Sequence, residues 1–386
     1  MNRILSAVVA SIVSWCVVVS SAVPVGADEL DDALKVLRSV GPKAENHAAA
    51  QQAWPIVSRG ATADLPRVLA ALDDAGPLAA NWIRSAAEVI AQRARQSSDA
   101  AAAPLLETFV RDTAHRPLGR RLAFELLRQA DPTAEARLMP SFLNDPSTEL
   151  RREAVDRVVA EAEAAANDAD KKSLYRRAYD AARDVDQVKQ LAASLDKLGD
   201  KVDVPTHLGF ITRWKLIGPF DNTGEKGFAV AYPPETEIRL DAKYPGKGGG
   251  EIAWIDFTTD DPYGDVDLNK ALGKNKGAAA YAYAEFQSAQ AAPVEFRIGA
   301  ISAIKLWVNG KLLDSREVYH SGSEIDQYIS RGELQPGVNR ILVKVCENEQ
   351  TENWAQDWKF QLRICDATGT AVLSQDRVAS ATSNSE

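Results

Sequence analysis

Histidine, cysteine and methionine are scarce in this chain of 386 residues, which contains four, three and two of them. So few histidines and cysteines leave little material for a zinc site, and no Cys-x-x-Cys pair suggests thiol redox chemistry. Positive charge is also in deficit, with 45 Lys and Arg against 54 Asp and Glu and a net charge of −9. Because binding to a phosphate backbone needs a basic field, this balance argues against a nucleic-acid partner.

Long apolar runs are absent except at the start of the chain. That run covers residues 4–22 behind a basic start, and the small residues Val25 and Ala27 precede Asp28. The layout predicts a secretory signal peptide over residues 1–27, cut after Ala27, and a periplasmic or extracellular protein without an integral membrane segment. The alternative is an uncleaved membrane anchor, because the length of this apolar run comes near the roughly 20 residues that span a bilayer. A proline and a glycine just before the cut favour cleavage.

Cleavage would leave two cysteines, Cys346 and Cys365. We expect them on neighbouring strands, each on the face turned away from the core and near opposite ends of the pair. An oxidising compartment permits a disulfide between them, but this placement does not favour one.

The two halves of the chain differ in composition. Residues 28–200 are rich in Ala, Leu and Arg and hold seven aromatic residues, whereas residues 201–386 hold nineteen. Ala and Leu favour helix, and aromatic and β-branched residues favour half-buried sheet. We therefore expect a helical domain over residues 28–200 and a β-sandwich over residues 207–375. The polar, serine-rich residues 376–386 are expected to form a disordered tail.

The helical half contains an internal repeat. Segments that begin at Arg84, Arg121 and Arg152 align with one another, and each follows an apolar segment that ends in Asp. The pattern over about residues 45–165 resembles HEAT repeats, in which paired antiparallel helices stack into a solenoid. That resemblance implies an elongated surface for a protein partner. Further apolar periodicity over residues 174–198 predicts a fourth, atypical helix pair, interrupted near Asp184 or Asp186.

The second half reads as short strands between turn signals, with an Asn309-Gly310 hairpin turn, which together predict a sandwich or barrel. The expected strands cover residues 210–217, 251–257, 281–286, 294–298, 304–308, 341–345, 360–364 and 371–374.

A family resemblance covers about residues 300–366. Trp307-Val308-Asn309-Gly310 ends one strand, and Gly337-Val338-Asn339 opens a second, valine-rich strand. This pattern resembles the galactose-binding-like jelly roll that stands beside the catalytic barrel of family-two glycoside hydrolases. The resemblance implies an antiparallel β-sandwich jelly roll that binds carbohydrate or serves as a scaffold.

Carbohydrate sites combine exposed aromatic faces with amide and carboxylate groups, and two loops offer these. Trp354, Asn353 and Asp357 lie in one loop, and Tyr263 lies in an acidic one. Packing against the protein is the alternative for each tryptophan of the first loop, and it is favoured for Trp358.

The acidic loop also offers a candidate Ca²⁺ site at Asp260, Asp265 and Asp267. Its spacing starts like an EF-hand, but Lys270 replaces the required glycine and Lys276 the final acidic ligand. A solvated loop is therefore the first expectation, with no required cofactor.

Catalytic motifs are not evident. None of the four histidines lies near a nucleophile elbow or has zinc-ligand spacing, and the glycine-rich residues 246–250 precede a strand rather than a phosphate-binding helix. We therefore expect an exported, non-catalytic binding or scaffold protein. An enzyme, or an enzyme's accessory subunit, that acts on cell-surface polysaccharide is the alternative.

Overall fold

The computed structural model describes residues 26–377. Nearly all of the predicted signal peptide and the chain from residue 378 lie outside the described residues. No helix in the described part is long and apolar enough to cross a membrane. The chain divides into two compact units between Arg137 and Leu138. Helices occupy residues 27–208 and antiparallel sheets the C-terminal half, so the predicted multidomain α and β class is confirmed.

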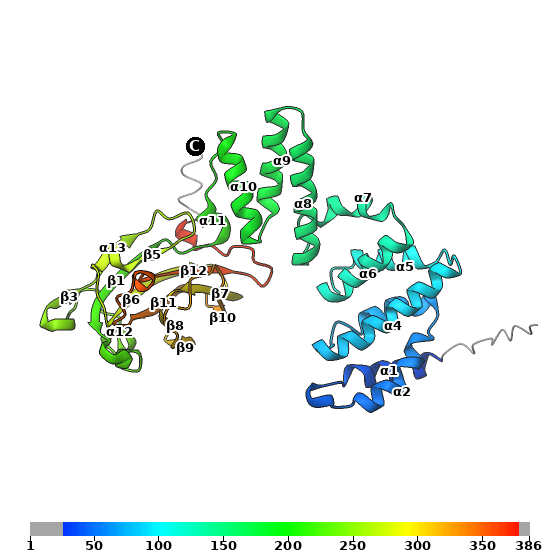
Figure 1. Cartoon of the computed structure of the whole chain (residues 1–386), viewed down its shortest axis with the longest axis horizontal. Helices are drawn as coiled ribbons and strands as arrows, with labels where there is room; N and C mark the ends of the chain where they lie inside the picture. The colour runs from blue at the N-terminus through cyan, green and yellow to red at the C-terminus, as the bar shows by residue number, and fades with distance from the viewer. Residues whose placement is uncertain (1–25, 378–386) are drawn as a thin grey trace, which may run out of the picture. The chain divides into compact units, whose positions relative to one another are not determined.

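From residue 26 onward the first unit contains helices and no strand, and its helices pack in sequential pairs (Figure 1). Small side chains such as Ala86 and Ala123 are fully buried where helices meet, which allows close approach. Pro77 and Pro117 begin their helices, where a missing backbone N–H costs nothing. The helices are α1 (Ala27–Arg38), α2 (His47–Ser58), α3 (Leu65–Ala70), α4 (Pro77–Gln96), α5 (Ala102–Arg111), α6 (Pro117–Ala130) and the short α7 (Ala134–Leu138) at the division.

The second unit begins with a further set of helices. Side chains of Ser147 and Asn167 accept hydrogen bonds from free N–H groups at the starts of two of them. The predicted interruption is confirmed, because Asp184 is the N-cap residue of the last long helix. These helices are α8 (Thr148–Ala164), α9 (Asp168–Ala181), α10 (Val185–Lys197) and the short α11 (Val204–Leu208).

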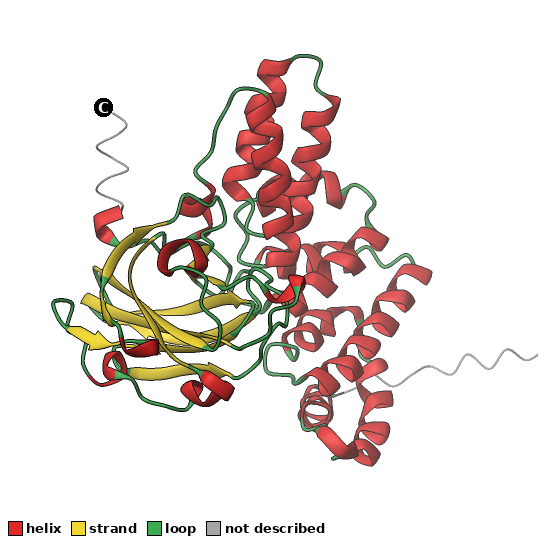
Figure 2. Cartoon of the chain, turned by 60° about the vertical axis from the view of Figure 1, so that its left-hand side comes forward, coloured by secondary structure: helices red, strands yellow, loops and turns green. Residues whose placement is uncertain are grey.

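Two antiparallel sheets form the rest of the second unit (Figure 2). The six-stranded sheet has the order β4-β1-β6-β11-β8-β9, and the four-stranded sheet has the order β10-β7-β12-β5. A small ribbon joins β2 to β3, with the glycine-rich residues 246–250 as its turn. The strands are β1 (Arg213–Asp221), β2 (Lys243–Pro245), β3 (Glu251–Ala253), β4 (Ile255–Thr258), β5 (Val266–Asp267), β6 (Ala278–Ser288), β7 (Ala292–Ala300), β8 (Ala303–Val308), β9 (Lys311–Arg316), β10 (Tyr328–Leu334), β11 (Gly337–Glu347) and β12 (Lys359–Cys365).

The main core lies between the two sheets and follows from the alternation of side chains along each strand. Alanines of β6 and Trp214 of β1 come from one sheet, and Phe296 of β7 and Phe360 of β12 come from the other. Seven of the eight expected strand regions contain strands. The region 371–374 does not, because only Ala371 makes an isolated bridge to Cys365.

The two asparagines of the sequence motif join neighbouring turns. Asn309 and Gly310 both have left-handed backbone angles, with φ of 51° and 79°, as a two-residue hairpin turn requires. The Asn309 side chain donates to Asn339 Oδ1 at 2.9 Å and accepts from the Arg340 N–H at 2.8 Å. Asn339 is buried and donates to the Gln335 carbonyl. The motif therefore fixes two adjacent turns of the six-stranded sheet.

The expectation that the two cysteines lie on neighbouring strands is wrong. Cys346 lies on β11 in the six-stranded sheet, whereas Cys365 lies on β12 in the four-stranded sheet. Both are buried free thiols, and burial raises the pKa of the Cys346 thiol to about 12. The alternation pattern shows which face a residue occupies but not which sheet its strand joins, and this is why the prediction failed.

The start of the predicted disordered tail is ordered. Residues 375–377 form a helical turn, in which Asp376 pairs with Arg213 and Arg377 donates to the Phe210 carbonyl. These charged groups find partners at the start of β1, which composition alone did not indicate.

Helices α8 to α11 share a core with the sandwich inside the second unit. Val155, Tyr179 and Leu191 from the helices pack in one apolar cluster with Phe210. Arg151 donates to the Thr368 carbonyl, and Arg183 donates to Thr370 Oγ1 at 3.2 Å. The predicted boundary near residues 200–207 therefore falls within one compact unit.

His207 provides a test of this shared core. Its ring packs against Tyr179, and Nε2 donates to the Ala182 carbonyl at 2.8 Å. Burial lowers the pKa of His207 from its usual 6.5. Protonation therefore favours the unfolded state, so this stability is present above pH 6.5 and is lost as the pH falls. We expect the urea midpoint of the second unit to fall between pH 7.5 and 5.5.

A His207→Gln variant should show a flatter pH profile over the same range, and His47→Gln, at an exposed position, serves as the control. If the urea midpoint of His207→Gln falls with pH as steeply as that of the parent chain, His207 is not the group whose protonation lowers the stability.

Candidate binding groove

The outer face of the six-stranded sheet carries a row of side chains that crosses five strands. Strand pairing places Asp256, Lys215, Tyr283, Leu342 and Trp307 side by side, from β4 through β1, β6 and β11 to β8. Their neighbours along β1, β6, β11 and β8 point into the sandwich core. This row forms the base of the candidate site, and its two central side chains, Tyr283 and Leu342, are buried.

An insertion between β1 and β3 covers one part of this face. Its short helix α12 (Pro233–Thr236) is held by Lys344, a fully buried lysine on β11. Lys344 Nζ donates to Glu235 Oε1 at 2.8 Å and to the Val230 carbonyl at 2.7 Å, while the Tyr281 hydroxyl also donates to Glu235. Burial lowers the pKa of Lys344, and Glu235 opposes that change. The insertion is thereby fixed as a wall beside the uncovered part of the sheet.

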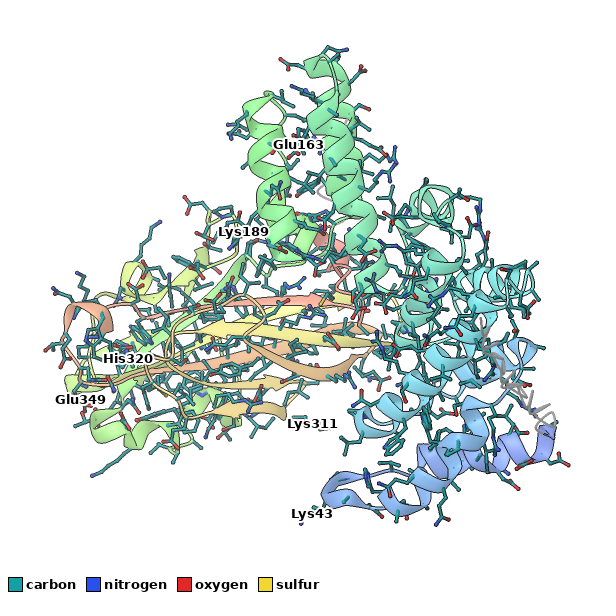
Figure 3. All side chains as sticks on the ribbon, turned by 45° about the vertical axis from the view of Figure 1, so that its right-hand side comes forward. Lys43, Glu163, Lys189, Lys311, His320 and Glu349 are labelled. Carbon is teal, nitrogen blue, oxygen red and sulfur yellow. The ribbon has the colours of Figure 1, made fainter. Side chains whose placement is uncertain are left out.

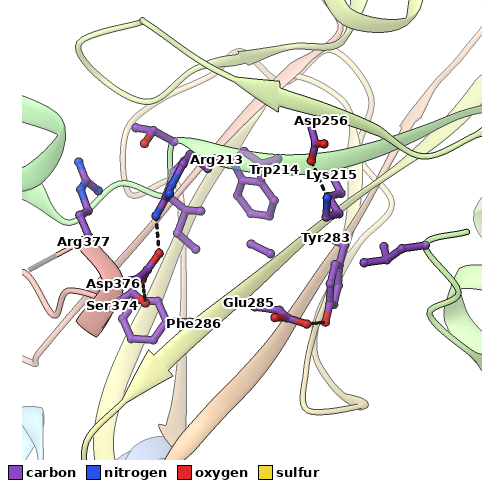
Figure 4. Close-up of a pocket in the computed structure, with 14 residues that line it drawn as sticks. Arg213, Trp214, Lys215, Asp256, Tyr283, Glu285, Phe286, Ser374, Asp376 and Arg377 are labelled. Atoms are coloured by element: carbon purple, nitrogen blue, oxygen red, sulfur yellow. Dashed lines mark hydrogen bonds and ion pairs between the residues drawn. The ribbon is translucent and has the colours of Figure 1, made fainter. Parts of the chain in front are cut away.

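The uncovered part holds two adjoining hollows of about 410 and 630 Å³. Leu240, Tyr283 and Glu285 line both hollows, so we treat them as one groove, here called the outer-face groove. Volumes in this range are typical of small-molecule sites. The first hollow is drawn in Figure 4, with Arg213, Lys215 and Asp376 along its edge. The second extends to Trp307, Arg340 and the Asn309-Gly310 turn.

Polar groups in the groove are paired with one another. Lys215 Nζ lies 2.6 Å from Asp256 Oδ1, and the Tyr283 hydroxyl donates to Glu285 Oε1 at 2.8 Å (Figure 4). Burial raises the pKa of Tyr283, so its hydroxyl stays a neutral donor. The groove therefore presents fixed donors and acceptors beside the half-buried ring of Trp307.

The candidate residues of the 353–358 loop lie elsewhere. Trp354 is 63% exposed on a short 3-10 helix, and its ring meets His320 edge-on at 5.2 Å. Asn353 and Asp357 are exposed beside it, with Asp357 3.8 Å from Lys359. Trp358 is buried in the sandwich core, as the packing interpretation predicted.

Tyr263 has different surroundings. Lys189 of α10 lies over its ring at 4.7 Å, and the tyrosine packs against the helix–sandwich cluster. Figure 3 shows Lys189 on the helical side and His320 at the loop end of the sandwich. The structure therefore does not join Tyr263 and Trp354 in one site.

The three candidate calcium ligands serve other contacts. Asp267 accepts from the Lys270 N–H at the start of a short helix, Leu268–Leu272, and Asp265 pairs with Lys359 at 3.1 Å. Burial raises the pKa of Asp265. Asp260 is almost fully exposed and lies 3.8 Å from Lys270. In residues 26–377, no cluster of three or more acidic, histidine or cysteine side chains is arranged to hold a metal ion.

The outer-face groove was not found from the sequence, although one signal was present. Trp307 and Tyr283 occupy outer-face positions in two strands that the sequence predicted. Their common row depends on β11 lying between β6 and β8, which alternation cannot reveal.

No family model and no curated protein sequence matches this chain. Solved structures with partial likeness include an anti-sigma factor domain-containing protein from Clostridium clariflavum, with 12% identity, TM-score 0.25, and coverage of 43% of this chain and 45% of that one. A beta-glucosidase from Kluyveromyces marxianus in complex with glucose has 10% identity and TM-score 0.23, covering 34% of this chain and 16% of that one.

The DNA glycosylase AlkC from Pseudomonas fluorescens, bound to DNA containing an abasic site analog, has 10% identity and TM-score 0.21. It covers 89% of this chain and 95% of that one. This chain spans less than half of the first two proteins. All three likenesses are remote and assign no activity here.

Proposed function

We propose that this chain is an exported, non-catalytic binding protein whose β-sandwich binds carbohydrate in the outer-face groove. One observation carries the proposal. The row of side chains on the outer face of the sheet places the Trp307 ring in one groove with Tyr283 and with charged side chains that line it. A sugar ring presents C–H groups on its faces and hydroxyl groups around its rim. An aromatic ring beside fixed donors and acceptors suits both parts of such a ligand.

One group that would meet the hydroxyls is already oriented before binding. Glu285 accepts from the hydroxyl of the buried Tyr283, which directs its carboxylate, whereas the pair of Lys215 and Asp256 is exposed. Pre-orientation lowers the entropy that binding must overcome. Four of the five carboxylates that line the groove, those of Asp256, Glu285, Asp376 and Glu235, already have a partner, which favours binding over acid–base chemistry.

The other parts of the proposal concern the fold families and the location. A galactose-binding-like identity for the sandwich is supported by the hydrogen bond between Asn309 and Asn339. This bond joins the two turns that contain the two parts of the sequence motif. A HEAT-like identity for the helices is supported by their sequential pairing. Such stacks expose long surfaces, so we assign the helices to binding a protein partner. Export rests on the predicted signal peptide.

A glycan array probed with the chain from residue 28 onward tests the proposal. A segment cut at residue 207 is unsuitable, because it would expose the apolar cluster that Phe210 shares with the helices. We expect selective binding that weakens at least tenfold, or about 1.4 kcal/mol, in Trp307→Ala. The unfolding transition of the variant should be measured to show that the sandwich is retained.

Trp354→Ala is the matched control, because it removes an exposed tryptophan outside the groove. Loss of binding in Trp354→Ala but not in Trp307→Ala would move the site to the 353–358 loop. A clean negative array, with and without Ca²⁺, would overturn the carbohydrate assignment and leave the scaffold role.

A further inference from the structure

We propose that the glycan site is confined to the second hollow of the outer-face groove, here called the Trp307 hollow, and that it takes a short unit of one or two sugars without acid groups. The Trp307 hollow is the one of about 630 Å³ that extends to Trp307, Arg340 and the Asn309-Gly310 turn. This inference rests on the proposed function and specifies its ligand. Three observations lead to it: the cover over the middle of the sheet face, the place of the accessible aromatic ring, and the charge of the lining.

The middle of the outer face is covered. Tyr283 and Leu342 are only 3% and 7% exposed. Ile238 of the insertion packs in the same apolar cluster, and the Trp254 ring, between β3 and β4, meets the Tyr283 ring edge-on at 6.3 Å. Because Tyr283 is buried and yet lines both hollows, it stands between them as a shared wall. A ligand in the Trp307 hollow therefore ends its contacts at Tyr283 rather than continuing across the sheet.

The aromatic rings of the first hollow are not accessible to a ligand. Trp214 and Phe286 line it, but they are 3% and 5% exposed and belong to the sandwich core. The Trp307 ring lies half-buried on the outer face of the sheet. A sugar ring needs an accessible aromatic face against which its C–H groups can pack. Of the two hollows, the Trp307 hollow is the one that provides this contact.

The width of the Trp307 hollow limits the number of sugars. Tyr283 on β6 and Trp307 on β8 are separated by β11, so the hollow crosses two strand spacings. At about 4.8 Å per spacing this is a span of about 10 Å, or about two linked sugar rings. A longer glycan can bind through such a unit, but its further sugars lie outside the hollow.

The charge of the Trp307 hollow disfavours an acidic sugar. Glu235, Glu237 and Glu285 line it, and Arg340 is the one cationic side chain among the described residues of its lining. Lys344 neutralises Glu235, so two carboxylates face one guanidinium. A carboxylate or sulfate on the ligand would meet a like charge there. Neutral hydroxyl groups can donate to the carboxylates and accept from the guanidinium.

The first test measures affinity against ligand length by titration calorimetry on the chain from residue 28 onward. The ligands are cello-, xylo- and manno-oligosaccharides from monosaccharide to hexasaccharide, together with a ladder of any further neutral glycan that the array selects. We expect Kd to fall between disaccharide and hexasaccharide by no more than about fivefold, the number of overlapping disaccharides in a hexasaccharide. A larger fall overturns the inference, because it requires contacts beyond the Trp307 hollow.

Two variants locate the ligand. Lys215→Ala changes the first hollow and Trp307→Ala the Trp307 hollow. Trp307→Ala should weaken disaccharide and hexasaccharide by the same factor, whereas Lys215→Ala should leave both affinities unchanged. Weaker hexasaccharide binding in Lys215→Ala would place part of the ligand in the first hollow and overturn the inference.

The charge of the ligand is tested with the uronic acid form of the disaccharide that binds best. At low salt it should bind roughly threefold more weakly than the neutral form, and the difference should narrow in Glu237→Gln, whose side chain is exposed. Equal or tighter binding of the acidic form overturns the inference and leaves the proposed function standing. Failure of every carbohydrate in array and ladders overturns the proposed function itself.

Discussion

An Asp326→Asn variant should unfold its second unit at a markedly lower urea concentration, with a loss of about 4 kcal/mol in the free energy of unfolding. Asp326 lies in the connection before β10 and accepts from Arg363 Nε at 2.6 Å and from Arg297 Nη1 at 2.9 Å. The Arg363 side chain is 1% exposed and also donates to the Leu208 carbonyl. Removing the carboxylate leaves the buried Arg363 guanidinium without an acidic partner, and this group cannot release its proton, whereas Arg297 keeps its pair with Glu295.

Asparagine is the appropriate replacement at this position. The backbone of Asp326 is left-handed, with φ of 64°, and asparagine tolerates that conformation. The loss therefore reports the missing charge rather than backbone strain. Asp256→Asn is the control, since its pair with Lys215 is exposed and such pairs contribute about 1 kcal/mol or less. A loss in Asp326→Asn no larger than in this control would show that the buried network is not needed for stability.

The same variant should alter the response to acid. Burial acts to raise the pKa of Asp326, but its contacts with Arg363 and Arg297 outweigh burial and lower it below the usual 3.8. The stability that this carboxylate contributes is thus present above pH 3.8 and is lost as the pH falls through its lower, folded-state pKa. Asp326→Asn should therefore lose less stability than the parent chain when the pH is lowered below 4.

A Glu235→Ala variant should lose about 3 kcal/mol, the lower end of the range for breaking a buried ion pair. Glu235 is the charged partner of the fully buried Lys344 and also accepts from Tyr281. Unlike a guanidinium, the lysine can become neutral when its partner is removed, which limits the loss. Urea unfolding checks the size of the effect, and Glu237→Ala, at an exposed position two residues further along the chain, is the control.

The double variant Glu235→Ala with Lys344→Met tests the cause of the loss. Replacing both charges with apolar groups should restore most of the stability, because neither group then remains buried without a partner. A double variant as unstable as Glu235→Ala would show that shape, rather than charge, holds the insertion in place. Since α12 forms the wall of the outer-face groove, Glu235→Ala should also weaken glycan binding while Trp307 is intact.

Strands with partners on both sides were the predictable part of the fold. β7, β11 and β12 place apolar residues at every second position, because one face of each lies in the core. β9 and β10 were missed for a physical reason: each is an edge strand with one neighbour, and its side chains are largely exposed. Their sequences therefore lack the apolar alternation by which the inner strands were recognised.

The candidate site was less predictable than the fold. Trp354 drew attention because it lies in a polar loop, and the structure does leave it exposed. Trp307 is less conspicuous, since a tryptophan within a strand resembles a packing residue. Its place in a groove depends on four strand pairings and on an insertion anchored from β11 by Lys344. Such long-range pairings leave no local pattern in the sequence.

The contacts that join α8 and the connection between α9 and α10 to the sandwich set an order of events during synthesis. Arg151 finds the Thr368 carbonyl 217 residues later in the chain, and Arg183 finds Thr370 187 residues later. At about 5 to 20 residues per second, a ribosome takes roughly ten to forty seconds to bridge the longer of these intervals. The helices of the second unit therefore lack these two contacts until almost the whole chain has been made. The first unit has no such dependence, because the helix pairs that form its core are complete by Arg137.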